Sequence, residues 1–240
     1  MMLALALLLM LQDPPAGGES SLDICLEGRT KPPEMVISAC ERVLADPALT
    51  ADARSGALNN IGLAHRRLGA MDEALRYYDL AIAADPDLEL PYNNRANLYS
   101  AQGRHALAVA DYGRALEKNP KLAEAWNGRC WSRLFVENAA GDALADCNEA
   151  LRLRPNSPAT LDSRGYAFLV RGEYDKALAD FRTAAEALPS AASPRYGLGL
   201  AKVCAGIAGG DADLEAAKRM DPTVDETAPV TETTVECRRG

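Results

Sequence analysis

Prolines recur along this chain at an almost constant interval, and this period limits the possible fold more than any other feature. They are Pro86, Pro120, Pro155, Pro189 and Pro222, with successive gaps of 34, 35, 34 and 33 residues. A period of this size is typical of repeat arrays, in which each unit buries its apolar face only against its neighbours. The sequence therefore predicts one stacked array rather than two globular domains.

Each interval between prolines divides into two helical halves. Apolar residues such as Leu178 and Phe181 recur at helical spacing, which predicts amphipathic helices. Gly69, Gly103 and Gly172 separate the two halves. A proline ends the second half, because it cannot continue a helix and disfavours helical backbone in the residue before it. The expected fold is all-α, an α-solenoid of antiparallel helix hairpins with about four full repeats and degenerate terminal units.

Small and aromatic residues also recur in step with the prolines. The first full unit reads Leu58-x2-Ile61-Gly62-x2-His65, then Ala74-x3-Tyr78 and Ala81, and the fourth has Leu161-x2-Arg164-Gly165-x2-Phe168, then Ala177-x3-Phe181 and Ala184. This pattern resembles the tetratricopeptide repeat, in which two antiparallel helices cross at small residues with an aromatic residue between them. The segments around Trp126 and Cys147 are similar to exported bacterial members of that family. The resemblance covers most of the chain from Cys25 to Pro222.

The ends of the chain predict a further division. We expect a signal peptide over residues 1–18, an array over 21–222 and a disordered tail over 223–240, with units at about 21–47, 55–88, 89–122, 123–157, 158–191 and 192–222. The apolar run from Met1 to Leu11 is too short to span a bilayer but suits the core of a signal peptide, although no Lys or Arg precedes it. The alternative is a frayed hydrophobic N-terminus. With a signal peptide, the protein is periplasmic or secreted and has no stable membrane span.

The six cysteines fit the repeat pattern. Cys130 and Cys147 replace a small residue and an aromatic residue at positions that face each other within one hairpin, and Cys25 and Cys40 repeat this arrangement in the first unit. We expect two disulfides, Cys25–Cys40 and Cys130–Cys147, since an exported chain meets an oxidising compartment. The alternative is free, buried cysteine acting as a small hydrophobe. Cys204 and Cys237 could pair with each other, or Cys237 could link to another chain.

The first helix of each repeat lines the concave face of such arrays, where a partner peptide or helix usually binds. The candidate partner-binding residues on this face are Asn59, Leu63, Arg66, Asn93, Asn97, Asn127, Trp131, Asp162 and Tyr166. Trp131 and Tyr166 form a candidate aromatic anchor, with asparagines bonding an extended backbone. The alternative for Trp131 is packing against the neighbouring helix.

Charges and histidines exclude several classes of function. A net charge of -8 argues against nucleic-acid binding, and two lone histidines form neither a metal cluster nor the base of a nucleophile. We expect no catalytic residues, no metal site and no cofactor. Arg95, Arg129 and Arg164 share one repeat position and Asp111, Asp146 and Asp180 another, which indicates ion pairs within hairpins, with an arginine groove for an acidic peptide as the alternative.

The predicted function is a non-enzymatic scaffold in the cell envelope that binds a protein or peptide partner of unknown identity on its concave face. The alternative is a self-associating structural or accessory subunit of an envelope assembly or an enzyme complex.

Overall fold

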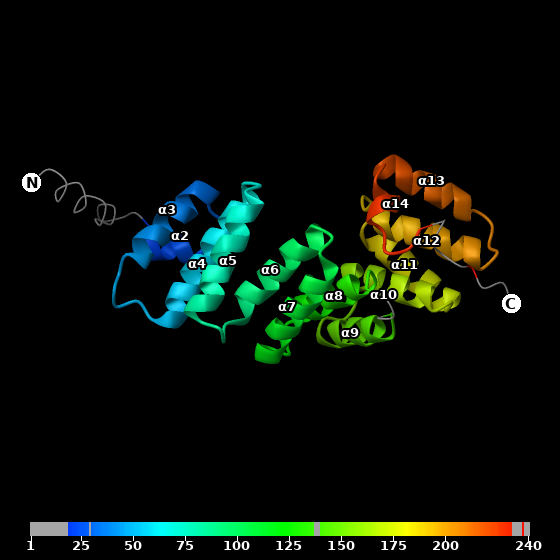
Figure 1. Cartoon of the computed structure of the whole chain (residues 1–240). Helices are drawn as coiled ribbons and strands as arrows, with labels where there is room; N and C mark the ends of the chain where they lie inside the picture. Colours follow the sequence, from blue (N-terminus) through cyan, green and yellow to red (C-terminus); the bar gives the residue numbers. More distant parts are fainter. Residues whose placement is uncertain (1–18, 29, 137–139, 232–236, 238–240) are drawn as a thin grey trace, which may run out of the picture. The chain divides into compact units, whose positions relative to one another are not determined.

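The computed structural model describes residues 19–28, 30–136, 140–231 and 237 (Figure 1). The residues described are helical or lie in short connections, with no strand among them, so the all-α prediction is confirmed. The helices are α2 (Ser21–Leu26), α3 (Pro33–Leu44), α4 (Ala51–Arg67), α5 (Met71–Ala84), α6 (Glu89–Ala101), α7 (His105–Lys118), α8 (Ala123–Arg133), α9 (Ala140–Leu153), α10 (Pro158–Val170), α11 (Tyr174–Ala187), α12 (Ala192–Cys204), α13 (Gly210–Met220) and α14 (Val224–Thr227).

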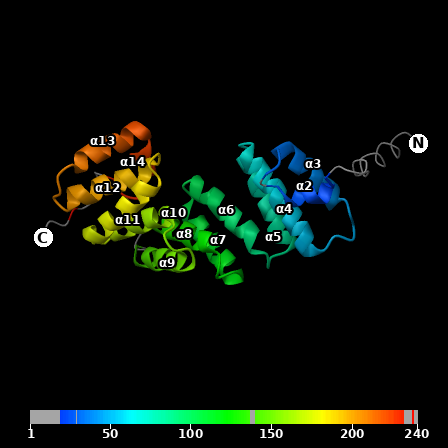
Figure 2. The ribbon, with the colours of Figure 1, turned by 180° about the vertical axis from the view of Figure 1, so that it is seen from behind.

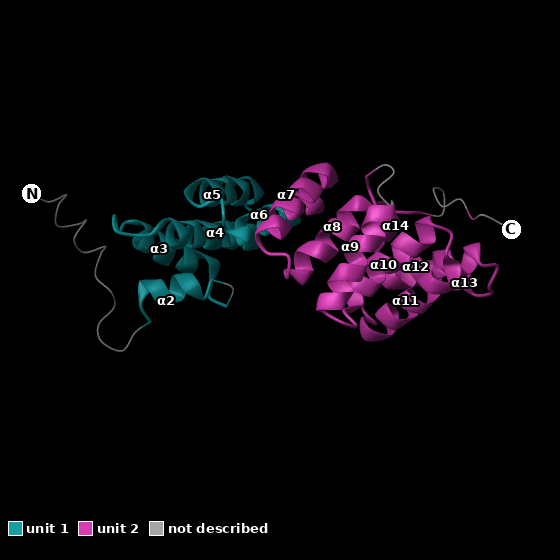
Figure 3. Ribbon diagram, turned by 90° about the horizontal axis from the view of Figure 1, so that it is seen from below, with its two compact units in different colours: residues 1–98 teal, residues 99–240 magenta. Residues whose placement is uncertain are grey.

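Consecutive helices pack in pairs within two compact units, residues 1–98 and 99–240 (Figure 3). In unit 1, α4 packs against α3 and α5, and α2 packs against α3 and α4. In unit 2, the hairpins α8/α9, α10/α11 and α12/α13 follow one another, with α9 against α10 and α11 against α12. The view from behind shows the same succession of hairpins within unit 2 (Figure 2). This is the packing of helix hairpins that the proline period predicts.

Glycines in left-handed backbone connect the two helices of a hairpin. Gly69, Gly103 and Gly172 have φ angles of +77°, +70° and +74°. An L side chain at such an angle brings Cβ against the backbone, so glycine adopts this conformation at least cost. The three glycines predicted to separate the helical halves therefore occupy equivalent turns.

Aromatic rings fill the space that glycines leave free at the helix crossings. A Cβ atom on Gly128 of α8 would lie 2.3 Å from Cζ of Tyr112 on α7, and one on Gly165 would lie 2.7 Å from Cε1 of Phe181. Such distances are far inside van der Waals contact, so these glycines let the rings lie against the backbone. The alternation of small and aromatic residues in the sequence is thus a packing rule.

The buried apolar residues form more than one cluster within each unit. In unit 1, Val36 and Ile61 pack with the Cys25–Cys40 disulfide. The largest cluster lies in unit 2 and includes Tyr166, Phe181 and Tyr196. Each core lies between successive helices, as expected for repeats that cannot bury an apolar face alone.

The C-terminal part of the chain differs from the prediction of a disordered tail over 223–240. Residues 224–227 form α14, and Val224, Ala228 and Val230 are buried in the same cluster as α12. The sequence signal was weak, because these apolar residues lie among threonines, glutamates and prolines. The predicted signal peptide, residues 1–18, lies outside the described residues, as do 232–236 and 238–240.

Candidate functional site

A groove opens in unit 1 beside the first helices of two successive hairpins, and we call it the unit 1 groove. Its volume is about 930 Å³. It is lined by α2 and the connection after it, by α3, by α4 and by the start of α6 with the connection into it. The lining residues are Leu22, Cys25, Leu26, Glu27, Thr30, Val43, Asp52, Ala53, Gly56, Ala57, Asn59, Asn60, Leu88 and Leu90. Four leucines, two amides and two carboxylates therefore define its chemistry.

Exposed leucines on α2 form the apolar rim of the unit 1 groove. Leu22 and Leu26 are one helical turn apart and are 51% and 68% exposed. Side chains four residues apart lie on the same face of a helix, so the two leucines present one continuous apolar surface. A surface of this kind, rimmed by polar groups, is typical of a binding site.

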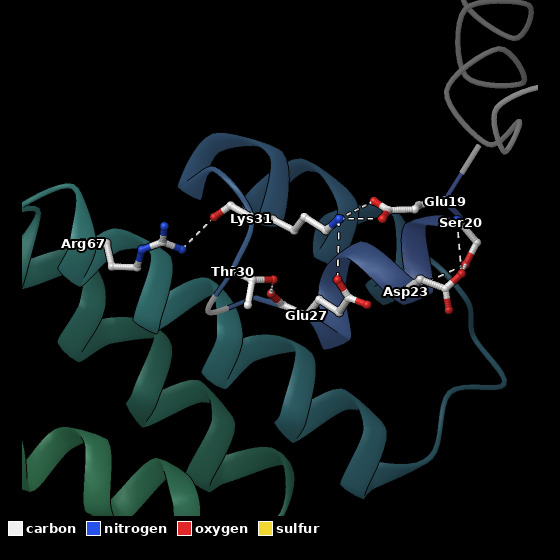
Figure 4. Close-up of polar contacts among 7 residues, drawn as sticks. All are labelled: Glu19, Ser20, Asp23, Glu27, Thr30, Lys31 and Arg67. Carbon is white, nitrogen blue, oxygen red and sulfur yellow. Dashed lines mark hydrogen bonds and ion pairs between the residues drawn. The ribbon is translucent and has the colours of Figure 1, made fainter. Parts of the chain in front are cut away.

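Polar contacts hold α2 in place although it has only six residues (Figure 4). Ser20 caps its first turn, with Asp23 N donating to Ser20 Oγ and Ser20 N donating to an Asp23 carboxylate oxygen. Lys31 pairs with Glu19, before the helix, and with Glu27, after it, at 2.5 and 3.5 Å. The hydrogen bond to Glu19 raises the pKa of the Lys31 ammonium. These contacts fix the helix that carries the exposed leucines.

Two further links attach this first hairpin to α4. The guanidinium Nη1 of Arg67 donates to the carbonyl oxygen of Gly28, at 2.9 Å. It also donates to that of Lys31, at 2.8 Å (Figure 4). The Cys25–Cys40 disulfide joins α2 to α3, with Cα atoms 4.9 Å apart. The groove wall is therefore tied down by a covalent bond and by charged hydrogen bonds.

Asparagines form the floor of the unit 1 groove through a chain of hydrogen bonds. Asn94 Nδ2 donates to Asn59 Oδ1 at 2.8 Å, and Asn59 Nδ2 donates to Asn60 Oδ1 at 3.4 Å. Asn60 Nδ2 then donates to the carbonyl oxygen of Cys25 at 2.9 Å. This amide chain connects α6, α4 and α2 across the floor of the groove.

The predicted partner-binding residues of unit 1 lie in different surroundings. Asn59 lines the groove, but it is only 5% exposed and its amide bonds to other asparagines. Leu63 and Asn93 are also buried, which corrects their assignment as accessible contacts in this structure. Arg66 and Asn97 are half-buried, and neither lines the unit 1 groove.

The aromatic anchor predicted in unit 2 is also corrected. Tyr166 is fully buried, its ring lies edge-on to Phe181 at 4.9 Å between centroids, and its hydroxyl donates to the carbonyl oxygen of Ser193 at 3.1 Å. Trp131 is half-buried and lies edge-on to Tyr166, with centroids 5.7 Å apart. The structure thus places Trp131 against the neighbouring repeat, which was the alternative, and leaves Tyr166 inaccessible.

Asp162, another predicted contact residue, is a buried acid between α10 and α12. Its Oδ2 accepts a hydrogen bond of 2.7 Å from Ser193 Oγ, whereas its buried Oδ1 has no hydrogen-bond partner. Burial raises the pKa of this carboxyl to about 7. Asn127, one repeat earlier, is half-buried and also has a buried Oδ1 without a partner.

The predicted arginine and aspartate positions form ion pairs between helices. Arg129 pairs with Asp146 at 2.8 Å, and Arg164 pairs with Asp180 at 2.7 Å. In unit 1, Arg95 reaches Asp79 of the preceding helix, at 2.6 Å. Arg129 and Arg164 therefore form ion pairs that join the two helices of a hairpin, which is what their repeat positions indicated.

All six cysteines are paired in the structure. Cys25–Cys40 and Cys130–Cys147 join helices of one hairpin, and Cys204–Cys237 joins the end of α12 to the C-terminal part of the chain. The sequence left the pairing of Cys204 and Cys237 open.

Across the described ranges, no group of three or more His, Cys, Asp or Glu side chains could hold a metal ion.

The groove leucines were missed by sequence reasoning. Leu22 and Leu26 have helical spacing in a unit too degenerate to be aligned residue by residue, and Leu88 and Leu90 flank a repeat boundary. Their spacing on a short, capped helix was the available signal.

Within the described part of the chain, no helix combines the length and apolar character that crossing a membrane requires.

Comparison with known families agrees with this geometry. Models of the tetratricopeptide repeat match residues 55–88, 90–122 and 163–221, which together make up more than half of the chain. The chain belongs to the tetratricopeptide repeat family. The family resemblance seen in the sequence is thus confirmed. The fold of the chain is that of a protein–protein interaction scaffold. The disulfide-bonded unit at 123–157 lies between the matched ranges.

Solved tetratricopeptide repeat structures share the solenoid fold. One from Parabacteroides merdae has a TM-score of 0.64 at 24% identity, over 85% of this chain and 80% of that one. YrrB, described as having an unusual peptide-binding site, has a TM-score of 0.61 at 19% identity, over 78% of this chain and 94% of that one. MamA has a TM-score of 0.54 at 20% identity, over 72% and 91%. These similarities establish the fold alone.

A curated relative is similar over part of the chain. Protein FlbA of Caulobacter vibrioides is 28% identical over 109 residues, which are 45% of this chain and 18% of FlbA. The match therefore covers less than a fifth of the length of FlbA.

Proposed function

We propose that this tetratricopeptide repeat protein is an exported scaffold without catalytic activity of its own, and that it binds an apolar segment of a partner protein in the unit 1 groove. The observation that carries the proposal is the pair of exposed leucines, Leu22 and Leu26, on a helix held rigidly at the rim of the groove. Burying one leucine side chain contributes about 1.5–3 kcal/mol, so a few such contacts support specific binding.

The charges around the unit 1 groove favour a partner segment that also carries Lys or Arg. Glu27 and Asp52 line the groove, and none of the described residues that line it is basic. Asp52 lies in the first turn of α4 and is exposed. Acidic groups beside an apolar groove attract a basic segment and repel an acidic one, which adds selectivity more than affinity.

One of the partner-binding residues predicted on the concave face, Asn59, is also part of this proposed site. Asn59 lies on the floor of the groove, and the first helices of α-solenoids usually line the surface that holds a partner. The proposal also keeps four of the predicted contacts, because part of each side chain is exposed: Arg66, Asn97, Asn127 and Trp131. The peptide-binding site in the printed description of YrrB supports the same class of function by analogy.

A peptide screen tests the unit 1 groove directly. Random 15-residue peptides are screened on the full-length protein, and the best binder is titrated against Leu26→Asp and, as a matched control, Leu80→Asp. Leu80 lies on α5, is 41% exposed and does not line the groove. We expect at least tenfold weaker binding for Leu26→Asp and unchanged binding for Leu80→Asp. Equal binding by both variants would refute the proposed site.

Export is supported by the pairing of all six cysteines and by the apolar N-terminal run in the sequence. Expression of the chain with and without residues 1–18, followed by fractionation and alkylation of free thiols, tests it. We expect processed, thiol-free protein in the exported fraction only when residues 1–18 are present. Free thiols in an exported, processed chain would contradict the proposed pairing.

A further inference from the structure

The last hairpin carries an apolar surface on its first helix, α12. Tyr196 and Leu200 follow Asp162 and Tyr166 by one repeat of 34 residues, so they occupy positions predicted to face a partner in the earlier units. Both are almost fully buried, at 0% and 1% exposure. Among the described residues, α13, α14 and the segment after α14 follow α12 along the chain, and both α13 and α14 contact it.

Residues 224–231, which we call the C-terminal segment, contribute to this burial. Its α14 contacts α12, much as α10 contacts α8 and α12 contacts α10. Val224, Ala228 and Val230 belong to the same buried cluster as Tyr196 and Leu200. In unit 2, α14 follows directly after α13 (Figure 3). The C-terminal segment thus contacts α12 in the way that the first helix of a further repeat would.

The conformation of the C-terminal segment resembles that of a bound peptide more than that of a capping helix. α14 has four residues and ends before Pro229, and Ala228 is extended, with φ -74° and ψ 143°. The buried side chains of the segment are small or β-branched: Val224, then Ala228 four residues later, then Val230 two residues after that. Thr227 donates hydrogen bonds to the carbonyl oxygen of Thr223, and Ala228 N donates to that of Val224, while Val224, Ala228 and Val230 pack into the buried cluster of α12.

A disulfide tethers the chain beyond this segment. Cys204 at the end of α12 is bonded to Cys237, with Cα atoms 4.7 Å apart. Cys237 is half-buried, whereas both cysteines of each hairpin disulfide are at most 2% exposed. Thiol–disulfide exchange requires access of a thiolate to a sulfur atom, so the tail disulfide is the one most open to a reductant.

We propose that α12 presents a second binding surface, for an extended segment with small and β-branched apolar residues, and that the C-terminal segment occupies this surface while Cys204–Cys237 is oxidised. The surface belongs to unit 2 and does not depend on the unit 1 groove. Covalent tethering makes occupation intramolecular, so a partner segment of similar chemistry competes poorly until the tether is opened.

Opening the tether requires a dithiol reductant. One thiolate of the dithiol attacks a sulfur of the Cys204–Cys237 bond and forms a mixed disulfide, which the second thiol then resolves. The bridge gains two electrons and two protons and becomes two cysteine thiols, while the dithiol becomes a disulfide. The segment then remains attached only through residues 221–223, and the surface exchanges occupants more readily.

The test uses full-length proteins and a labelled peptide with the sequence of residues 221–231. Cys204→Ser/Cys237→Ser removes the tether, and Val230→Asp added to it weakens docking of the segment. Thr227→Asp in the same background is the matched control, because Thr227 is exposed. By fluorescence anisotropy we expect at least tenfold tighter peptide binding to the Val230→Asp protein than to the Thr227→Asp protein, and the weakest binding to oxidised wild type.

A second measurement on wild type does not depend on any substitution. Dithiothreitol is titrated until alkylation and mass spectrometry show reduction of Cys204–Cys237 alone, and hydrogen exchange is then followed over residues 196–204. We expect at least tenfold faster exchange after reduction. Unchanged exchange overturns the proposal, as does absence of peptide binding by a folded Val230→Asp protein. If circular dichroism shows that this variant is unfolded, the exchange result decides alone.

Discussion

The guanidinium of Arg129 and the carboxylate of Asp146 meet through two parallel hydrogen bonds, Nε to Oδ2 and Nη2 to Oδ1, each 2.8 Å long. Arg133 donates to the same carboxylate at 2.6 Å. Asp146 is almost fully buried, and the two arginines are largely buried with it. One carboxylate therefore pairs with two guanidinium groups between α8 and α9, next to the Cys130–Cys147 disulfide.

Replacing Asp146 with alanine should leave two largely buried guanidinium groups without their shared partner. We expect a loss of about 3 kcal/mol in the free energy of unfolding, since breaking a buried pair from one side is costly. The double variant Asp146→Ala/Arg129→Met should recover part of this loss, because it removes one of the stranded charges. Urea unfolding with the disulfides intact measures both, and a double variant less stable than Asp146→Ala would contradict the expectation.

The stability of the protein should fall as pH rises through the range in which Asp162 titrates. Burial raises the pKa of this carboxyl to about 7 in the folded protein, whereas an unfolded aspartate has a pKa of about 4. Between these values the unfolded chain binds fewer protons than the folded one, so the contribution is full below pH 4 and is lost by about pH 7.

The matched variant for this prediction is Asp162→Asn. An amide keeps an oxygen that can accept the hydrogen bond from Ser193, and it does not ionise. Urea unfolding of wild type and variant at pH 5 and pH 8 should show a drop of a few kcal/mol in wild type, by order of magnitude. The variant should show a much smaller drop. Equal pH dependence in the two proteins would mean that Asp162 is not the group responsible.

Two glycines of unit 2 should respond in opposite directions to alanine. Gly128→Ala places Cβ 2.3 Å from Cζ of Tyr112 and forces a ring or a helix to move, at a cost of about 1–3 kcal/mol. Gly113→Ala places Cβ 3.8 Å from Arg129 Nη1, an ordinary contact, and should stabilise α7 by about 0.5–1 kcal/mol. Thermal or urea unfolding compares the two, and similar effects would contradict the crossing geometry.

Loss of the Cys130–Cys147 disulfide should destabilise unit 2. The bond closes a loop with a sequence separation of 17, for which the chain-entropy model gives about 3 kcal/mol. The variant Cys130→Ser/Cys147→Ser should therefore unfold at lower urea concentration than wild type. Mass spectrometry of unreduced peptides checks the pairing first, and free thiols at both positions in exported wild type would contradict it.

The repeat architecture could be predicted from the sequence because its signals are local and repeated. Gly69, Gly103 and Gly172 have the same left-handed turn, and the prolines follow the second helices at the expected period. Ion pairs such as Arg164 with Asp180 also followed from register, since equivalent positions in each unit face each other. Repetition converts a weak single-unit pattern into a strong one.

Accessibility was harder to predict than register. Tyr166 and Leu63 have the register of partner-facing residues, but their burial depends on which side chain of the next helix reaches them. The unit 1 groove escaped prediction because α2 is short and belongs to a degenerate unit. The C-terminal segment escaped for a similar reason, since Val224, Ala228 and Val230 have no repeat to mark them as core.

The amide chain from Asn94 through Asn59 and Asn60 to the carbonyl of Cys25 has a consequence for the breadth of recognition. Amides that already bond to one another have few free groups with which to read a ligand's polar pattern. A segment that enters the unit 1 groove is then discriminated by the shape and charge of its side chains. Such a floor favours a family of partners with a common apolar and basic character over a single sequence.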